Sequence, residues 1–206
     1  LRKAVFISHF PESKCAASLI KQVLEEEGDC ASDDRIRKRV RSLLRDLDRA
    51  QVVAMAWQAG KIPASLLPTD QEDLADFFTR WIRVWRTGAV TSDPDSTPKS
   101  SPEPVSVSFL ERIDESSGSQ NVFMSGTRRI YGVFERDGLG SVLAVWRDEN
   151  NPQAVFQECE PIHKDRVFNY VWFEPSEHWP PGRYRLELYD PSNGLRFLGS
   201  GMFEVN

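Results

Sequence analysis

The stretch WPPGRYRLELYD, residues 179–190, carries the clearest structural signal in this 206-residue chain. A tryptophan and two prolines lead into Gly182, after which apolar and polar side chains alternate. Every second residue from Tyr184 to Leu188 is apolar, and the residues between them are charged. Such alternation is typical of a β-strand with one buried face. The stretch therefore predicts a strand that begins directly after a proline–glycine turn.

The same alternation extends over residues 106–206. Turn residues such as DGLG and PSNG separate the alternating segments. About seven short strands in about 100 residues predict an all-β, antiparallel sandwich. Trp146 lies in a strand near the middle of this half and is predicted to fill the core between the two sheets. The predicted strands lie within VSVSFLERI, RRIYGVFER, SVLAVWRDE, QAVFQECEPI, RVFNYVWFEP, GRYRLELYD and LRFLGSGMFEVN.

This half resembles immunoglobulin-like and fibronectin type III modules. Its ending, WPPGRYRLELYDPSNGLRFLGSGMFEV, is similar to the last strands of bacterial immunoglobulin-like accessory domains. The resemblance implies a tyrosine corner, in which the Tyr184 hydroxyl turns back to a backbone group upstream. It is a resemblance of architecture and implies no catalytic residues. We therefore expect residues 179–190 to serve the fold rather than recognition.

A change in composition divides the chain. Residues 88–105 are rich in Pro, Ser, Thr and Asp and have almost no large apolar side chains, so they are expected to form a linker. This gives a helical domain over 1–87 and an immunoglobulin-like β-sandwich over 106–206.

Three amphipathic segments in the N-terminal half predict a small helical bundle. The first covers 12–27, and the third begins after a cap at Thr69 or Asp70 and carries a broad aromatic face. Between them, apolar residues recur every three or four positions, which favours one continuous helix over 33–59. An alternative breaks this helix near Arg49 and makes QVVAMAW, residues 51–57, a strand.

The opening KAVFISHFPESKCAASLIKQVLEEEG resembles the start of a TIR domain, and RIRKRVRSLLRDLDRAQVVAMAW is similar to a later helix and strand of that family. The resemblance implies that residues 6–9 form the first strand and the loop after it. The middle strands of the family have no counterpart between Gly28 and Asp33. No glutamate stands where the family's NAD-cleaving glutamate would be expected. The resemblance thus implies, as an alternative, a degenerate TIR-like signalling domain.

No set of residues completes a catalytic or metal site. Cys15 and His9 lack a third group that would orient them, and Cys15 lies on the apolar stripe of its helix. Cys159 and His163 are four residues apart, about 13 Å on a strand, which is too far for one zinc ion. We expect no enzymatic activity, cofactor or metal. The odd number of cysteines, three, favours reduced thiols and a cytoplasmic compartment.

The overall composition gives no reason to expect a membrane span or general binding to nucleic acid. The chain is 40% hydrophobic and 28% charged, with a formal net charge of −5. Its apolar runs are far shorter than the roughly 20 residues that cross a bilayer.

One helix nevertheless carries a basic ridge. Arg37, Arg41 and Arg45 follow each other at intervals of four residues and thus share a helix face. The ridge would suit phosphates of a nucleic acid or an acidic partner. The alternative is a solvated face whose charge is balanced by neighbouring aspartates and by the run Glu25–Glu27, and we favour this interpretation.

A second candidate binding site is aromatic. Phe168, Tyr170 and Trp172 alternate along one predicted strand, so they share a face. They would normally belong to the core, but if exposed they would bind a partner's aromatic patch or a sugar.

These observations favour a non-catalytic interaction or adaptor protein. In this hypothesis the helical domain docks a partner protein, and the β-sandwich recognises a ligand or acts as a spacer. The alternatives are the TIR-like domain, nucleic-acid binding through Arg37, Arg41 and Arg45, and carbohydrate binding by the sandwich.

Overall fold

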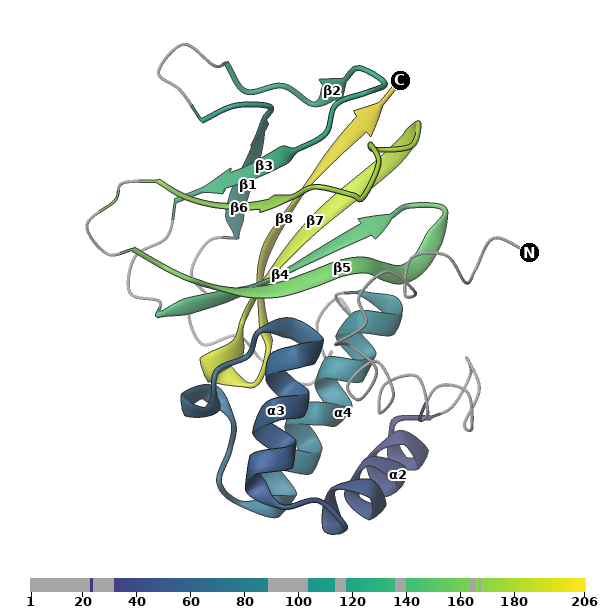
Figure 1. Cartoon of the computed structure of the whole chain (residues 1–206), viewed down its shortest axis with the longest axis vertical. Helices are drawn as coiled ribbons and strands as arrows, with labels where there is room; N and C mark the ends of the chain where they lie inside the picture. Colours follow the sequence, from purple (N-terminus) through teal and green to yellow (C-terminus); the bar gives the residue numbers. More distant parts are fainter. Residues whose placement is uncertain are drawn as a thin grey trace. The chain divides into compact units, whose positions relative to one another are not determined.

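The chain folds into two units, Leu1–Val84 and Trp85–Asn206. Of the predicted linker, residues 88–105, only the two ends are described, and Val105 already belongs to the first strand. The elements are labelled in Figure 1. The computed structural model describes Val23 and residues 32–88, 104–113, 118–135, 140–163, 166 and 168–206.

Helices make up the first unit. They are α2 (Asp33–Arg45), α3 (Arg49–Gly60) and α4 (Gln71–Thr87), with a 3-10 turn η1 at Ala64–Leu66 before α4. The predicted helix over 12–27 and the segment KAVFISHF lie outside the described residues, apart from Val23, which is helical and buried. The last residues of α4, from Trp85 onward, belong to the second unit.

The prediction of one helix over 33–59 was wrong, because the chain breaks between α2 and α3. Asp48 starts the new helix with a capping box: its side chain accepts a hydrogen bond from the Gln51 backbone N–H at 2.8 Å. In return, the Asp48 backbone N–H donates to Gln51 Oε1 at 2.9 Å. The alternative strand at residues 51–57 was also wrong, since these residues lie inside α3. The later strand of the TIR resemblance thus falls on a helix.

The aromatic face of α4 is buried. Phe77 and Phe78 pack edge-to-face with ring centroids 5.9 Å apart, and Phe78 lies 5.5 Å from Trp81. Trp81 and Ile82 have no exposed surface. This face therefore belongs to the core and offers no binding surface.

The second unit is β-rich. Each predicted strand segment contains a strand, and one short strand, β2, was not predicted. A 3-10 turn, η2 (Pro191–Asn193), joins the last two strands. The strands are β1 (Val105–Leu110), β2 (Val122–Phe123), β3 (Ile130–Phe134), β4 (Ser141–Asp148), β5 (Asn151–Pro161), β6 (Asn169–Phe173), β7 (Gly182–Asp190) and β8 (Arg196–Val205).

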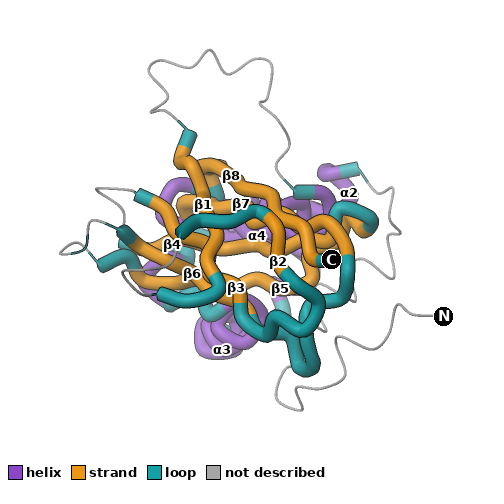
Figure 2. The backbone as a smooth tube through the Cα atoms, turned by 90° about the horizontal axis from the view of Figure 1, so that it is seen from above, coloured by secondary structure: helices purple, strands orange, loops and turns teal. Residues whose placement is uncertain are grey.

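The strands form one mixed, eight-stranded sheet in the order β5-β4-β7-β8-β1-β3-β6, with β2 paired to β8. Two of the pairings are parallel: Val105 lies opposite Gly199 in the β1–β8 pair, and Val122 lies opposite Glu204 in the β2–β8 pair. The sheet curls toward a barrel, as the view along it in Figure 2 shows. The predicted all-antiparallel, immunoglobulin-like sandwich was therefore wrong.

The physical reason for this difference is that β1 changes partner along its length. Its first two residues pair in parallel with β8, and residues from Val107 onward pair antiparallel with β3. This exchange joins what would otherwise be two sheets. It also requires close backbone contact, because a Cβ built on Gly199 would lie 2.0 Å from the Val105 carbonyl oxygen. Glycine is the residue that permits such an approach.

The curled sheet encloses an aromatic core. Trp146 is 1% exposed, as predicted, and its ring lies 5.8 Å from that of Trp179 and 6.0 Å from that of Phe203. The predicted tyrosine corner is also present, because the Tyr184 hydroxyl donates to the Pro180 carbonyl oxygen at 2.7 Å. Burial raises the pKa of this hydroxyl to about 12. Residues 179–190 thus serve the fold, as expected.

Candidate binding face

The three aromatic residues predicted on β6 lie at the protein surface. Tyr170 and Trp172 are 38% and 42% exposed, and Phe168, just before the strand, is 54% exposed. Asn169 and Val171, which alternate with them, are buried. This is the pattern of a strand with one face on the core. The outward-facing residues of such a strand are usually polar, whereas here they are large and aromatic.

Neighbouring strands extend this surface. Tyr131 on β3 lies opposite Trp172, and Val133 lies opposite Tyr170. The rings of Tyr131 and Tyr170 pack edge-to-face, 5.8 Å apart. On the other side of β3, Leu110 of β1 lies opposite Tyr131. We call this surface, formed by Leu110, Tyr131, Val133, Phe168, Tyr170 and Trp172, the aromatic face.

An arginine covers Trp172. The guanidinium of Arg129 lies 4.4 Å from the centre of the Trp172 ring, within the range of a cation–π interaction. The same guanidinium donates to Glu174 Oε2 through Nε and Nη2, at 2.9 and 2.7 Å, and to the Tyr131 hydroxyl at 3.2 Å. The hydrogen bonds to Tyr131 and Glu174 raise the pKa of Arg129, so it remains charged. Arg129 therefore holds Trp172 in place.

A second arginine lies at the other end of β6. Arg166 is exposed, and its guanidinium is 5.8 Å from the centre of the Tyr170 ring. Unlike Arg129, it forms no ion pair with any carboxylate among the described residues. This end of the aromatic face thus carries an exposed positive charge.

An open hollow lies beside Arg166. Its volume is about 530 Å³, and it reaches across three strands of the aromatic face. The lining is mostly apolar, with one cation at its rim. The hollow suits an apolar group that is followed by a negative charge. The lining residues are Leu110, Ile113, Val133, Arg166, Phe168 and Tyr170.

The sequence did not reveal Arg129, Tyr131 or Arg166 as members of this site. Alternation in RRIYGVFE, residues 128–135, places Arg129 and Tyr131 on one side of β3. Alternation does not show which strand pairs with β3 or in which register, because both depend on tertiary contacts.

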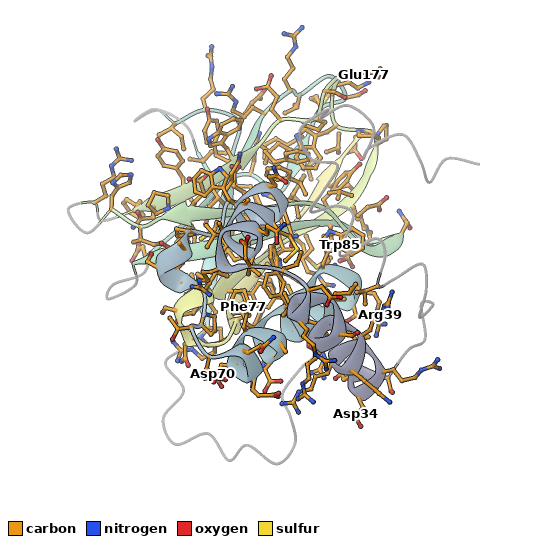
Figure 3. The ribbon with its side chains drawn as sticks, turned by 60° about the horizontal axis from the view of Figure 1, so that its bottom comes forward. Asp34, Arg39, Asp70, Phe77, Trp85 and Glu177 are labelled. Atoms are coloured by element: carbon orange, nitrogen blue, oxygen red, sulfur yellow. The ribbon has the colours of Figure 1, made fainter. Side chains whose placement is uncertain are left out.

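The structure places the basic ridge of α2 against carboxylates. Arg37 Nε lies 2.5 Å from Asp76 Oδ1, and Arg41 forms an ion pair with Glu72. Both carboxylates belong to α4, whereas the sequence suggested balancing charges on neighbouring residues. Arg45, in the last turn of α2, is exposed. Figure 3 shows the charged side chains of this unit, with Asp34 and Arg39 of α2 labelled.

Cys159, one of the two residues considered for a zinc ion, is buried. Cys159 is 7% exposed, and burial raises its pKa to about 12. Within the described ranges, no group of three or more His, Cys, Asp and Glu side chains has the arrangement of a metal site. None of the described helices is long and apolar enough to cross a membrane. Cys15 and His9 lie outside the described residues.

No protein-family model matches the chain, and no curated protein matches it significantly.

Proposed function

We propose that this chain is a non-catalytic interaction protein whose β-rich unit binds a segment of a partner protein through the aromatic face. One observation carries the proposal: Phe168, Tyr170 and Trp172 are all exposed on one side of a strand whose other side is core. Exposing large aromatic side chains to water is unfavourable, and grouped exposed aromatics are typical of protein-binding surfaces. In the same proposal the helical unit is the docking head that joins this module to its assembly.

The chemistry of the face favours a protein over a sugar. A sugar ring stacks on an open aromatic face, but Arg129 already covers one face of Trp172, 4.4 Å from the ring centre. The hollow beside Tyr170 is lined mainly by apolar side chains, which match an apolar side chain better than a hydroxyl-rich ring. Both features suit a peptide segment with a large apolar residue.

The alternative of nucleic-acid binding has less support. It requires unneutralised positive charge on α2, because phosphates are recognised by free cations. Arg37 and Arg41 instead form ion pairs with Asp76 and Glu72.

Selection from a random peptide library displayed on phage tests the proposal. The library is selected on the wild-type protein and, in parallel, on the double variant Tyr170→Ser/Trp172→Ser. We expect peptides with large apolar residues to be enriched on the wild type alone. Synthetic versions should bind the double variant about tenfold or more weakly, as is usual when aromatic anchors are removed.

The control is Met202→Ser, which removes an exposed apolar side chain (48% exposed) from β8. It should leave peptide binding unchanged. Equal enrichment on the wild type and the double variant would contradict the proposal. So would the absence of selected peptides together with Trp fluorescence changes on adding oligosaccharides, because that result would favour a sugar ligand.

A further inference from the structure

The two edges of the sheet differ in how well they are protected. Edge strands expose unpaired backbone N–H and C=O groups, and proteins normally protect them with charges, prolines or irregular pairing. One edge, β5, has all three: prolines at 152 and 161, the acidic residues Glu158 and Glu160, and register shifts in its pairing with β4.

The other edge, β6, has none of these devices. Its sequence is NYVWF, without a charged residue or a proline, and it pairs with β3 in unbroken register from Asn169 to Phe173. The four residues after Asn169 are of types with a high tendency to form strands. Among the described residues, no strand pairs with the outer edge of β6.

The sheet does not close between its two edges. β5 and β6 exchange no ladder hydrogen bonds in the described part of the chain. Instead, the rings of Phe156 and Phe173 stack across the gap, 4.4 Å apart and nearly parallel. The two edges are thus linked through side chains, while the backbone groups on the outer side of β6 form no ladder with a described strand and are ordered by the pairing with β3 on the other side. Such an ordered, unpaired edge is a template for another strand.

We infer that β6 is a β-augmentation site, at which an extended segment of a partner protein adds antiparallel to the sheet. The inference deepens the proposed function, since it says how the partner binds beside the aromatic face. Alternate side chains of the added strand would lie next to Tyr170 and Trp172 and extend the aromatic face by one row.

Charge complementarity identifies the chemistry of the partner strand. At the C-terminal end of β6, Glu174 already neutralises Arg129. At the N-terminal end, Arg166 has no carboxylate partner among the described residues. An antiparallel strand would match both ends of β6 if its first residues, opposite Trp172 and Tyr170, were apolar. Its last residues, toward Arg166, would be acidic. The partner segment is therefore apolar at its start and acidic at its end.

The length of the edge favours a peptide segment over a second copy of the chain. β6 has five residues. At about 3.4 Å per residue it is roughly 17 Å long. A strand of this length is too short to bury by itself the roughly 800 Å² per partner that stable protein pairs bury.

Synthetic peptides and the full chain test the inference. The probe is acetyl-Thr-Val-Thr-Val-Thr-Glu-Thr-Glu-amide, in which valines meet Trp172 and Tyr170 and the glutamates extend toward Arg166. Two further peptides carry N-methyl groups, one on the valine and glutamate amides and the other on the internal threonine amides. A fourth peptide has the reversed sequence, which brings glutamates to Glu174.

Backbone pairing makes an asymmetric prediction, because alternate amides of a strand point to opposite sides. One N-methylated peptide should bind about tenfold or more weakly than the parent, and the other should bind like the parent. The reversed peptide should also bind more weakly. Hydrogen exchange at the amides of residues 169–173 should slow when the parent peptide is bound. Trp172→Lys should abolish binding, and Met202→Lys, the matched exposed position on β8, should not.

Three results would overturn the inference. If both N-methylated peptides bind as tightly as the parent while Trp172→Lys still weakens binding, the aromatic face binds the peptide without strand pairing, and the proposed function stands alone. If the parent peptide does not bind at millimolar concentration, the edge does not accept such a strand. If the free protein is a dimer that Trp172→Lys dissociates, a second copy occupies the edge in place of a partner.

Discussion

Arg147 and Glu187 form a buried ion pair on the neighbouring strands β4 and β7, with Arg147 Nε donating to Glu187 Oε2 at 2.8 Å. They are 4% and 1% exposed. Arg147 Nη1 also donates to the Trp85 carbonyl oxygen at 3.0 Å, and the Tyr189 hydroxyl donates to Glu187 Oε2 at 2.8 Å. Gly88, at φ +80°, lies so close that an added Cβ would be 2.8 Å from Glu187 Oε1. The pair thus fixes the backbone of residues 85–88, at the start of the second unit.

Replacing Arg147 with methionine should destabilise the protein by about 3–5 kcal/mol, because the buried Glu187 would keep only the more distant Arg185, whose Nη1 lies 3.7 Å from Glu187 Oε1, as a cationic partner. The double variant Arg147→Met/Glu187→Leu should recover most of that loss, since it leaves no buried charge. Urea unfolding measures both effects. The control is Arg183→Met, which breaks a 3.7 Å pair between Arg183 and Glu204, 71% and 43% exposed, and should cost less than about 1 kcal/mol. Equal losses for Arg147→Met and Arg183→Met would contradict this account.

This pair shows what alternation in the sequence can and cannot predict. Alternation correctly located every strand except β2 and correctly placed Tyr184 and Trp146 in the core. It also put Glu187 on the charged side of β7, opposite the predicted buried face, and it made no prediction for Arg147. Both are buried, because β4 and β7 bury residues on both of their faces. Burial of the second face depends on tertiary packing, which a single strand pattern does not encode.

The break between α2 and α3 could have been predicted from the sequence. Asp48 and Gln51 have the spacing of a capping box, but the continuous apolar periodicity from 33 to 59 outweighed that signal. The parallel pairing of β1 with β8 could not have been predicted from the sequence. Alternation shows which residues share a face, but neighbours and strand direction depend on contacts between distant parts of the chain. Of the aromatic face, only Phe168, Tyr170 and Trp172 were predicted to share one side of a strand, and the sequence did not show that this side is exposed.

Gly199→Ala tests the parallel pairing directly. The new Cβ would lie 2.0 Å from the Val105 carbonyl oxygen, so β1 would have to move away from β8. We expect a loss of about 3 kcal/mol in unfolding free energy, at the upper end of single substitutions. Hydrogen exchange at Val105 and Ser106 should become faster. Gly140→Ala is the control, since nothing lies within 4 Å of its Cβ position. A Gly199→Ala variant as stable as Gly140→Ala would show that β1 and β8 do not pair this way.

Cys159 should be unreactive in the folded protein. Burial raises its pKa to about 12, well above the ordinary value near 9, so almost no thiolate exists at pH 8. Iodoacetamide should modify this position in urea and leave it intact in buffer, as mass spectrometry of the peptide would show. Rapid modification of the native protein at pH 8 would contradict the buried, neutral thiol.

The same raised pKa predicts a direction for stability at high pH. The unfolded chain loses the thiol proton near pH 9, whereas the folded chain keeps it until about pH 12. Since the folded state then binds more protons, stability falls as the pH rises between these values and is unaffected by this group below pH 9. Cys159→Ala removes this contribution, so its stability relative to the wild type should improve across that interval. An unchanged difference between the two proteins from pH 8 to pH 11 would contradict the assignment.

The ion pairs between α2 and α4 predict that the basic ridge can be unmasked. In the variant Glu72→Gln/Asp76→Asn, Arg37 and Arg41 lose their carboxylate partners. The freed guanidinium groups should then bind polyanions, and elution from heparin should require more salt than for the wild type. Stability should change by less than about 1 kcal/mol per pair, because the partners are 38–58% exposed.

The loss of two negative charges anywhere on the protein would also strengthen retention on heparin, so the control must remove two carboxylates as well. Glu135→Gln/Glu177→Gln removes two exposed carboxylates from the β-rich unit. If the ridge matters, this control should elute close to the wild type, and the α4 double variant should elute later. Adding Arg37→Gln/Arg41→Gln to the α4 variant should then reverse the delay. Equal delays for the two carboxylate variants would show that retention follows net charge and that α2 carries no latent anion-binding face.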